Sequence, residues 1–90
     1  MKITITVIDG RNNKKLDIQV DDEQRLKTTL RVLGENIEAF YFFQKIKEVQ
    51  IKNSGRRVSV ELTYREAKIY TGTEIVLKQE KRGVKKDEDN

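Results

Sequence analysis

Two short runs of alternating apolar and polar residues open the chain, and a helix pattern follows the second run directly. The runs span residues 2–8 and 15–20. Their inward positions are Ile3, Ile5, Val7, Leu16, Ile18 and Val20. A period of two is typical of a strand with one buried face, and the intervening Asp9-Gly10 and Asn12-Asn13 tolerate the backbone of tight turns. The chain is therefore predicted to begin with an antiparallel hairpin that leads straight into a helix.

The helix pattern begins in an acidic stretch. Asp21, with Gln24 three residues later, fits a capping box, and we interpret the acids at 21–23 as helix-capping groups and not as a metal site. The apolar stripe of the helix consists of Leu26, Leu30, Leu33 and Ile37. Gly34 is predicted to end the helix, while the continuation of the stripe to Ile37 leaves a second turn or an extension open.

Strand-like alternation returns after residue 47. The apolar positions of a predicted second hairpin, on either side of a turn at 53–55, are Val49, Ile51, Val58, Val60 and Leu62. Residues 63–68 are predicted to form a one-turn helical connection, after which Ile69 fills the core and Thr71-Gly72 makes a tight turn. A closing strand is expected at 73–79. The end of the chain is almost wholly charged, so we predict a folded domain over residues 1–78 and a disordered tail over 79–90.

Composition excludes most catalytic chemistry. A chain of 90 residues forms one domain with one modest core. Histidine and cysteine are both absent, which removes the commonest general base, the thiol nucleophile and the usual zinc ligands. The five glycines are isolated, so there is no phosphate loop and no dinucleotide fingerprint. We therefore expect a protein that is not an enzyme and has no metal or cofactor. With no signal peptide or membrane span in the sequence, we expect it to be cytoplasmic.

The predicted order is strand, strand, helix, strand, strand, short helical turn, strand. Residues 62–77 read Leu-Thr-Tyr-Arg-Glu-Ala-Lys-Ile-Tyr-Thr-Gly-Thr-Glu-Ile-Val-Leu. This segment resembles the ending common to ubiquitin-like proteins, in which Leu, a short turn, Ile, Gly and an acidic residue precede Ile-x-Leu. The resemblance implies an α+β, β-grasp (ubiquitin-like) fold, with a mixed sheet of about five strands packed on one main helix.

In length and layout, residues 1–78 are similar to the YukD/EsaB family, the small ubiquitin-like accessory proteins of type VII (WXG100) secretion systems in Gram-positive bacteria. This similarity implies a cytosolic, non-enzymatic component that assists or regulates the secretion machinery by contacting its membrane-anchored subunits or cytosolic ATPase. A homo-oligomer also stays open. Ubiquitin conjugation and sulfur transfer require a C-terminal Gly-Gly, whereas this chain has a lone Gly83 and ends at Asn90. We therefore expect neither role unless the tail is first cleaved.

One candidate binding site is the aromatic block Phe40-Tyr41-Phe42-Phe43. It holds four of the six aromatic residues of the chain. Consecutive residues on a regular element cannot all face one core. We expect two of them to close the core and the remainder to form a docking patch for a protein partner.

The other candidate site is the outer face of the sheet, expected to carry Thr4, Thr6, Ile8, Lys52, Arg57 and Val76. Ile8 and Val76 are apolar on faces that we expect to be wet, so they mark a partner or homodimer surface or are scattered exposed residues. Lys52, Arg56 and Arg57 form either a solvated edge protected by charge or a positive patch. With a net charge of +4, this cluster leaves a small basic nucleic-acid-binding protein as the alternative function.

Overall fold

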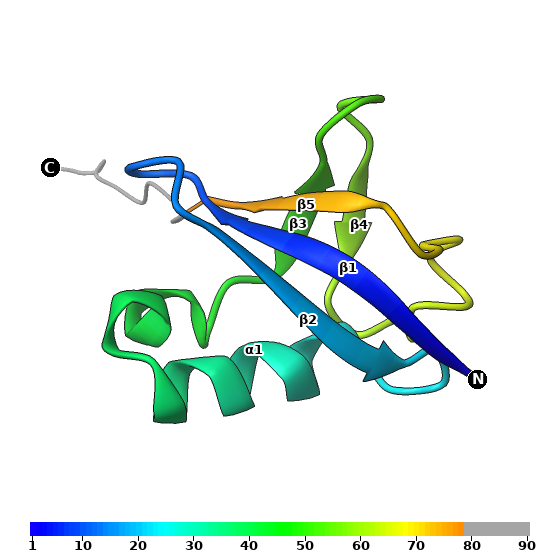
Figure 1. Ribbon diagram of the computed structural model, residues 1–90, viewed down its shortest axis with the longest axis horizontal. Helices are drawn as coiled ribbons and strands as arrows, with labels where there is room; N and C mark the ends of the chain where they lie inside the picture. The colour runs from blue at the N-terminus through cyan, green and yellow to red at the C-terminus, as the bar shows by residue number, and fades with distance from the viewer. Residues whose placement is uncertain (79–90) are drawn as a thin grey trace, which may run out of the picture.

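The computed structural model describes residues 1–78, and Figure 1 shows a sheet with one main helix against it. The elements are β1 (Lys2–Asp9), β2 (Lys15–Asp21), α1 (Leu26–Asn36), the 3₁₀ helix η1 (Glu38–Phe43), β3 (Glu48–Ile51), β4 (Arg57–Ser59) and β5 (Glu74–Leu77). Over the described range the strands form one five-stranded sheet in the order β2-β1-β5-β3-β4. β1 and β5 pair in parallel and the other neighbours are antiparallel, which confirms the α+β β-grasp prediction. The disorder predicted for 79–90 concerns residues outside the described range.

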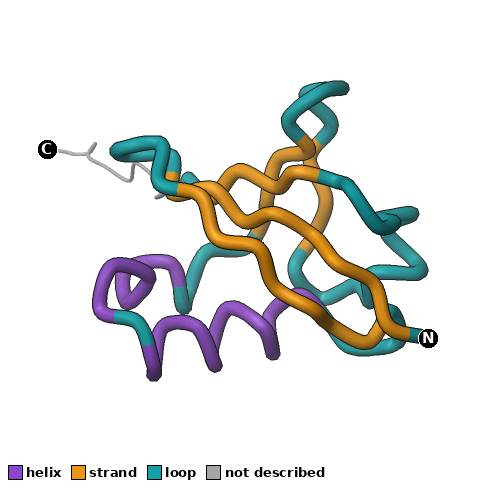
Figure 2. The backbone as a smooth tube through the Cα atoms, in the orientation of Figure 1, coloured by secondary structure: helices purple, strands orange, loops and turns teal. Residues whose placement is uncertain are grey.

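The core lies between the sheet and its helical layer. Ile5 and Val7 of β1, Leu26 of α1 and Phe43 of η1 are all at most 2% exposed. Both helical segments lie on the same side of the sheet (Figure 2). Among the residues that the structure describes, helices therefore cover one face of the sheet, and no helix covers the other.

The first hairpin closes as predicted, with Ile8 opposite Lys15 at its inner end. Its loop, residues 10–14, returns toward the end of β5. The Gly10 N–H donates to the Leu77 carbonyl over 2.8 Å, and a Cβ on Gly10 would lie 2.5 Å from that same oxygen. Glycine is thus required at position 10 by a close backbone approach.

The capping box predicted at Asp21 and Gln24 is wrong. α1 begins at Leu26, and its N-cap residue, Arg25, makes no side-chain capping bond. The amide groups of Leu26 and Lys27 instead donate to the carbonyls of Leu62 (3.0 Å) and Val60 (2.9 Å). The first turn of the helix is therefore satisfied by backbone from a distant part of the chain, and no local capping side chain is needed.

Gly34 does not end α1 but lies inside it, so the extension toward Ile37 is the correct alternative. The Ile37 N–H still donates to the Leu33 carbonyl over 2.8 Å, and η1 follows at once. The side chain of Gln44 occupies the space that a Cβ on Gly34 would take. The glycine therefore permits close packing between α1 and the end of η1.

The last third of the domain differs from prediction in the length of β4. This strand stops at Ser59, because Val60 and Leu62 turn away to meet the start of α1. Residues 63–68 form a single helical-type turn, in which the Ala67 N–H donates to the Thr63 carbonyl over 3.0 Å. Ile69 is 1% exposed, which confirms its predicted place in the core.

Candidate interaction surface

Strand register assembles one row of residues across the outer face of the sheet. The cross-strand pairs Lys15–Ile8, Ile8–Val76, Val76–Gln50 and Gln50–Arg57 link all five strands in turn. Paired residues on neighbouring strands point to the same face. The row therefore has an aliphatic centre and a cationic residue at each end.

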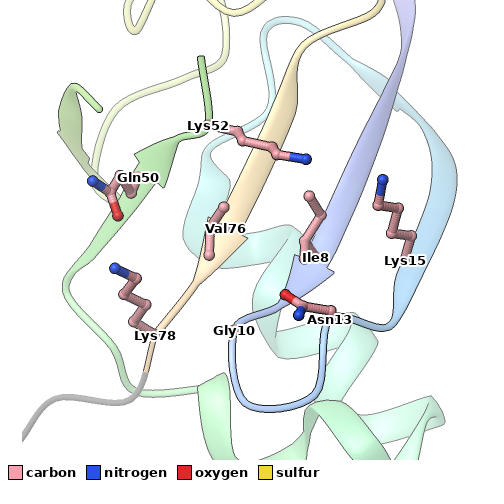
Figure 3. A pocket seen from close by; sticks show the side chains of 8 residues that line it. All are labelled: Ile8, Gly10, Asn13, Lys15, Gln50, Lys52, Val76 and Lys78. Atoms are coloured by element: carbon pink, nitrogen blue, oxygen red, sulfur yellow. The ribbon is translucent and has the colours of Figure 1, made fainter. Parts of the chain in front are cut away.

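A hollow of about 570 Å³ lies over the centre of this row (Figure 3). Its lining residues are Ile8, Gly10, Asn13, Lys15, Gln50, Lys52, Val76 and Lys78. Ile8 and Val76 lie in the middle of the view, with the side chains of Lys15, Lys52 and Lys78 around them (Figure 3). We call Ile8 and Val76 the apolar floor of the hollow, and the three lysines its cationic rim.

The prediction that Ile8 is wet is wrong. Ile8 is 3% exposed, although it lies outside the cluster that forms the main core, while Val76 is half-buried. Ile8 is enclosed between its cross-strand neighbours Lys15 and Val76. A lysine covers apolar surface with its methylene chain while keeping its ammonium group in water, which accounts for this burial.

Positive charge exceeds negative charge around the hollow. Glu74 lies in the next row, and its two carboxylate oxygens lie 3.8 Å from Lys15 Nζ and 3.7 Å from Lys52 Nζ. One carboxylate thus faces two ammonium groups, and Lys78 adds a third at the opposite side of the rim. No acidic side chain is among the described residues that line the hollow. The surface is suited to a negatively charged ligand.

The aromatic block divides between core and surface. Phe40 and Phe43 are 5% and 0% exposed, which confirms that two of the four close the core. Tyr41 and Phe42 are 60% and 54% exposed and contact each other edge to face, with ring centroids 5.7 Å apart. Large side chains exposed to this extent are candidate anchors for a partner.

Arg11 fixes the aromatic surface to the first hairpin. Its guanidinium donates to both carboxylate oxygens of Asp9, over 3.1 and 3.0 Å, and to the Ala39 carbonyl over 2.7 Å. It also lies 5.1 Å from the ring centre of Phe42 and 5.2 Å from that of Phe43, within cation–π range. We call the pair of Asp9 and Arg11 the loop clamp.

The Asp9 carboxylate of the clamp is fully buried. Hydrogen bonds from the Arg11 guanidinium hold its pKa below the usual value, against the effect of burial, which raises it. Sequence reasoning treated Asp9 as a turn residue and missed the clamp. The one available signal was an arginine two residues after an aspartate, and such spacing is common in turns that form no buried pair.

The predicted basic cluster is distributed among different neighbours. Lys52 belongs to the hollow, whereas Arg57, at the end of the row, lies 4.0 Å from Glu48. Arg56 donates to the Ala67 carbonyl over 2.9 Å. Each of the three side chains is therefore engaged separately, and Lys52 alone of them lines the hollow.

A metal-binding cluster and a membrane-spanning helix are both absent from the described residues. Residues 1–78 contain no group of three or more acidic side chains placed to hold a metal ion. Within the same range, no helix reaches the length and apolar character needed to cross a membrane.

Comparison with known proteins identifies the fold. No family model and no curated protein matches the sequence. Solved structures do match, among them the ubiquitin-like domain of an Arabidopsis thaliana protein, with 22% identity and a TM-score of 0.64 over 96% of this chain and 85% of that one. The ubiquitin-like domain of the Mycobacterium tuberculosis type VII secretion system protein EccD1 matches with 18% identity and a TM-score of 0.57, over 86% of this chain and 97% of that domain. Protomer 1 of the ESX-3 core complex matches with 12% identity and a TM-score of 0.61, over 97% of this chain and 18% of its own length. At these identities the likeness shows a ubiquitin-like fold.

Proposed function

We propose that the chain is a non-enzymatic ubiquitin-like protein-interaction module, a cytoplasmic accessory or regulatory component of a type VII secretion system. The observation that carries the proposal is the outer sheet face, where an apolar floor lies inside a cationic rim and no helix within residues 1–78 covers the surface. Protein interfaces combine apolar centres with polar margins in this way. The partners in this proposal are subunits of the secretion machinery.

The narrow set of side chains available for catalysis supports an interaction role. The chain has no histidine and no cysteine, and no described acidic cluster is placed to hold a metal. The residues with shifted pKa values belong to ion pairs and to a buried tyrosine. Asp9 pairs with Arg11, and the pKa of Tyr64 is raised to about 12 by its burial. Both groups have structural explanations.

The secretion role rests on two likenesses that agree. The sequence resembles the YukD/EsaB family in its pattern, and the fold matches the ubiquitin-like domain of a type VII secretion protein over nearly the whole of that domain. A module of this kind would act by holding machinery components together or by adjusting their assembly. It would need a docking face and no chemistry of its own.

The test is deletion of the gene in the organism that encodes it, combined with photo-crosslinking. A photoreactive residue is placed at Arg57, which lies at the end of the outer row and is 73% exposed, and separately at Tyr41. We expect deletion to reduce export of WXG100 substrates and at least one of the two positions to crosslink a secretion subunit. Intact export together with no crosslinked secretion subunit would refute the proposal.

A nucleic-acid-binding function is the second candidate, and the cationic rim of the hollow is the observation that favours it. Binding driven by lysine–phosphate contacts weakens steeply between about 50 and 200 mM salt. Fluorescence anisotropy with a single-stranded and a double-stranded oligonucleotide checks this. Absent or salt-independent binding at low salt removes the candidate.

A further inference from the structure

We infer that the hollow on the outer sheet face binds an acidic segment of a partner protein, with an aliphatic side chain of that segment on Ile8 and Val76 and its carboxylates on the lysine rim. This inference rests on the proposed function and names the chemistry of the partner. The three features that carry it are the apolar floor, the excess of positive charge and the size of the hollow.

The apolar floor supplies a place for an uncharged side chain. Ile8 and Val76 pair across the parallel strands β1 and β5 and so lie side by side at the middle of the sheet. Val76 is half-buried and lines the hollow. An aliphatic side chain placed here would remove the exposed part of Val76 from water, which is favourable in proportion to the apolar area covered.

The rim supplies the charge complementarity. Lys15, Lys52 and Lys78 reach the hollow from three different strands or strand ends (Figure 3). Glu74 balances one of the first two lysines, so the rim keeps a positive excess. Carboxylates on either side of an aliphatic residue would meet ammonium groups on either side of the floor. The volume of about 570 Å³ is within the roughly 300–1,000 Å³ typical of ligand sites.

A nucleic acid fits the hollow less well than a peptide does. Single-stranded nucleic acids bind by stacking their bases on aromatic rings as well as by phosphate contacts. None of the described residues that line the hollow is aromatic, and the exposed rings of Tyr41 and Phe42 belong to the other surface. The aliphatic side chains of Ile8 and Val76 provide neither a hydrogen-bond donor nor a positive charge for a phosphate group.

A second copy of the chain also fits less well. A twofold dimer places the same surface on both sides of the interface. Such a contact would set the lysine rim of one copy against the lysine rim of the other, and like charges at an interface are unfavourable. A partner with carboxylates avoids this repulsion.

The experiment is a selection of short random phage-displayed peptides on the full chain, followed by NMR mapping of the best peptide on the ¹⁵N-labelled protein. We expect enrichment of Asp and Glu around a Leu, Ile or Val. We also expect amide shifts centred on Ile8, Lys15, Lys52 and Val76. No enrichment, enrichment of basic or aromatic peptides, or shifts centred on Tyr41 and Phe42 would each overturn the inference.

Two variants and a matched control test the two parts of the site separately. Lys52→Glu reverses one rim charge and should lower the affinity for the selected peptide about tenfold or more. Val76→Thr makes the floor polar and should lower this affinity about fivefold. Lys45→Glu makes the same charge change at an exposed lysine outside the hollow and should leave affinity within about twofold. Circular dichroism confirms that each variant is folded. Equal affinity in Lys52→Glu and in Lys45→Glu would overturn the role of the rim.

Competition and sedimentation experiments test two other occupants of the hollow. An oligonucleotide that competes with the selected peptide at equal charge, or a dimer in sedimentation that dissociates in Lys52→Glu, would overturn the acidic-peptide assignment. Failure of the inference is distinguishable from failure of the proposed function. If Tyr41 crosslinks a secretion subunit and both Lys52→Glu and Val76→Thr restore export to the deletion strain, the proposed function stands and the assignment of the hollow falls.

Discussion

Replacing Arg11 with alanine should remove a large part of the stability of this domain. Asp9 is fully buried, and Arg11 donates three hydrogen bonds to its carboxylate, two from the guanidinium side chain and one from the backbone amide. Removing one partner of a buried ion pair costs about 3–5 kcal/mol, because it leaves an uncompensated charge. The Arg11 side chain is 38% exposed, so water can reach part of the vacated space and we take the lower part of that range.

The ring contacts add to this loss. Arg11 lies over both Phe42 and Phe43, and a cation–π contact contributes about 0.5–1 kcal/mol at an exposed site. We expect Arg11→Ala to lower the free energy of unfolding at pH 7 by about 3–4 kcal/mol, against a total of roughly 5–13 kcal/mol for a domain of this length. Urea unfolding followed by circular dichroism measures the difference. Lys14→Ala, an exposed lysine in the same loop, is the matched control and should change stability by less than about 0.5 kcal/mol.

The dependence on pH gives an independent check. The pKa of Asp9 is lowered in the folded protein, chiefly by hydrogen bonds from Arg11, from an ordinary value of 3.8. The clamp therefore contributes its full stability above pH 3.8 and loses it as pH falls through the lower folded pKa. Arg11→Ala removes the guanidinium hydrogen bonds, which are the largest cause of the lowered pKa of Asp9, while burial still raises this pKa and only the backbone N–H of residue 11 and the charge of Lys14 still lower it. The pKa of Asp9 should therefore be higher in the variant, and the variant should gain stability relative to wild type as the pH falls. A difference below about 1 kcal/mol at pH 7, or one that does not shrink in acid, would refute this account of the clamp.

Three further perturbations test other parts of the fold. Gly10→Ala should destabilise by about 1–3 kcal/mol in urea unfolding, because the new Cβ would lie 2.5 Å from the Leu77 carbonyl oxygen, and an unchanged midpoint would contradict that close approach. The side chains of Thr63 and Glu66 each accept a hydrogen bond of 3.0 Å from the backbone N–H of the other residue. Thr63→Ala should therefore lower the free energy of unfolding by about 1 kcal/mol, and Glu66→Ala should lower it by a similar amount if the two residues act as a pair. Burial raises the pKa of Tyr64 to about 12, so an absorbance titration should show one tyrosine that ionises late, and Tyr64→Phe should remove this signal. The stability of the wild-type protein should fall as the pH rises above 10. Equal titration spectra for the two proteins would contradict this prediction.

The sequence was sufficient to predict the sheet, the helix and the core, because these depend on local periodicity. A period of two assigns Ile3, Ile5 and Val7 to one face wherever the strand lies in the sheet. The helical period likewise assigns the apolar stripe of α1 to one face, and Leu26, Leu30 and Leu33 are all buried. The topology then followed from the order of the elements and its resemblance to ubiquitin-like proteins.

The errors arose where distant backbone decides the outcome. The start of α1 is satisfied by the carbonyls of Val60 and Leu62, so the acids at 21–23 were not needed as caps. The strand assigned through Leu62 ends at Ser59 for the same reason. Neither result is visible in a local window, because both depend on a contact between segments more than 30 residues apart.

The candidate site was only partly predictable. Periodicity placed Ile8 and Val76 on the outer face, but it carries no information on what covers a side chain there. Ile8 is buried because register sets Lys15 beside it, and register was not known from the sequence. The hollow itself needs Lys78 and Asn13, which reach it from a strand end and a turn.

The loop at residues 10–14 makes the two candidate surfaces interdependent. Gly10 and Asn13 line the hollow, while Arg11, between them, holds Asp9 and the aromatic segment. We therefore expect a rearrangement of the loop that releases Arg11 from its clamp to shift Gly10 and Asn13 as well. For this reason Arg11→Ala should lower the affinity for the selected acidic peptide, although Arg11 does not line the hollow. The loss of affinity should be larger than that in Lys14→Ala. If the two variants bind the peptide equally, the loop is not a common support and each surface must be held in place independently.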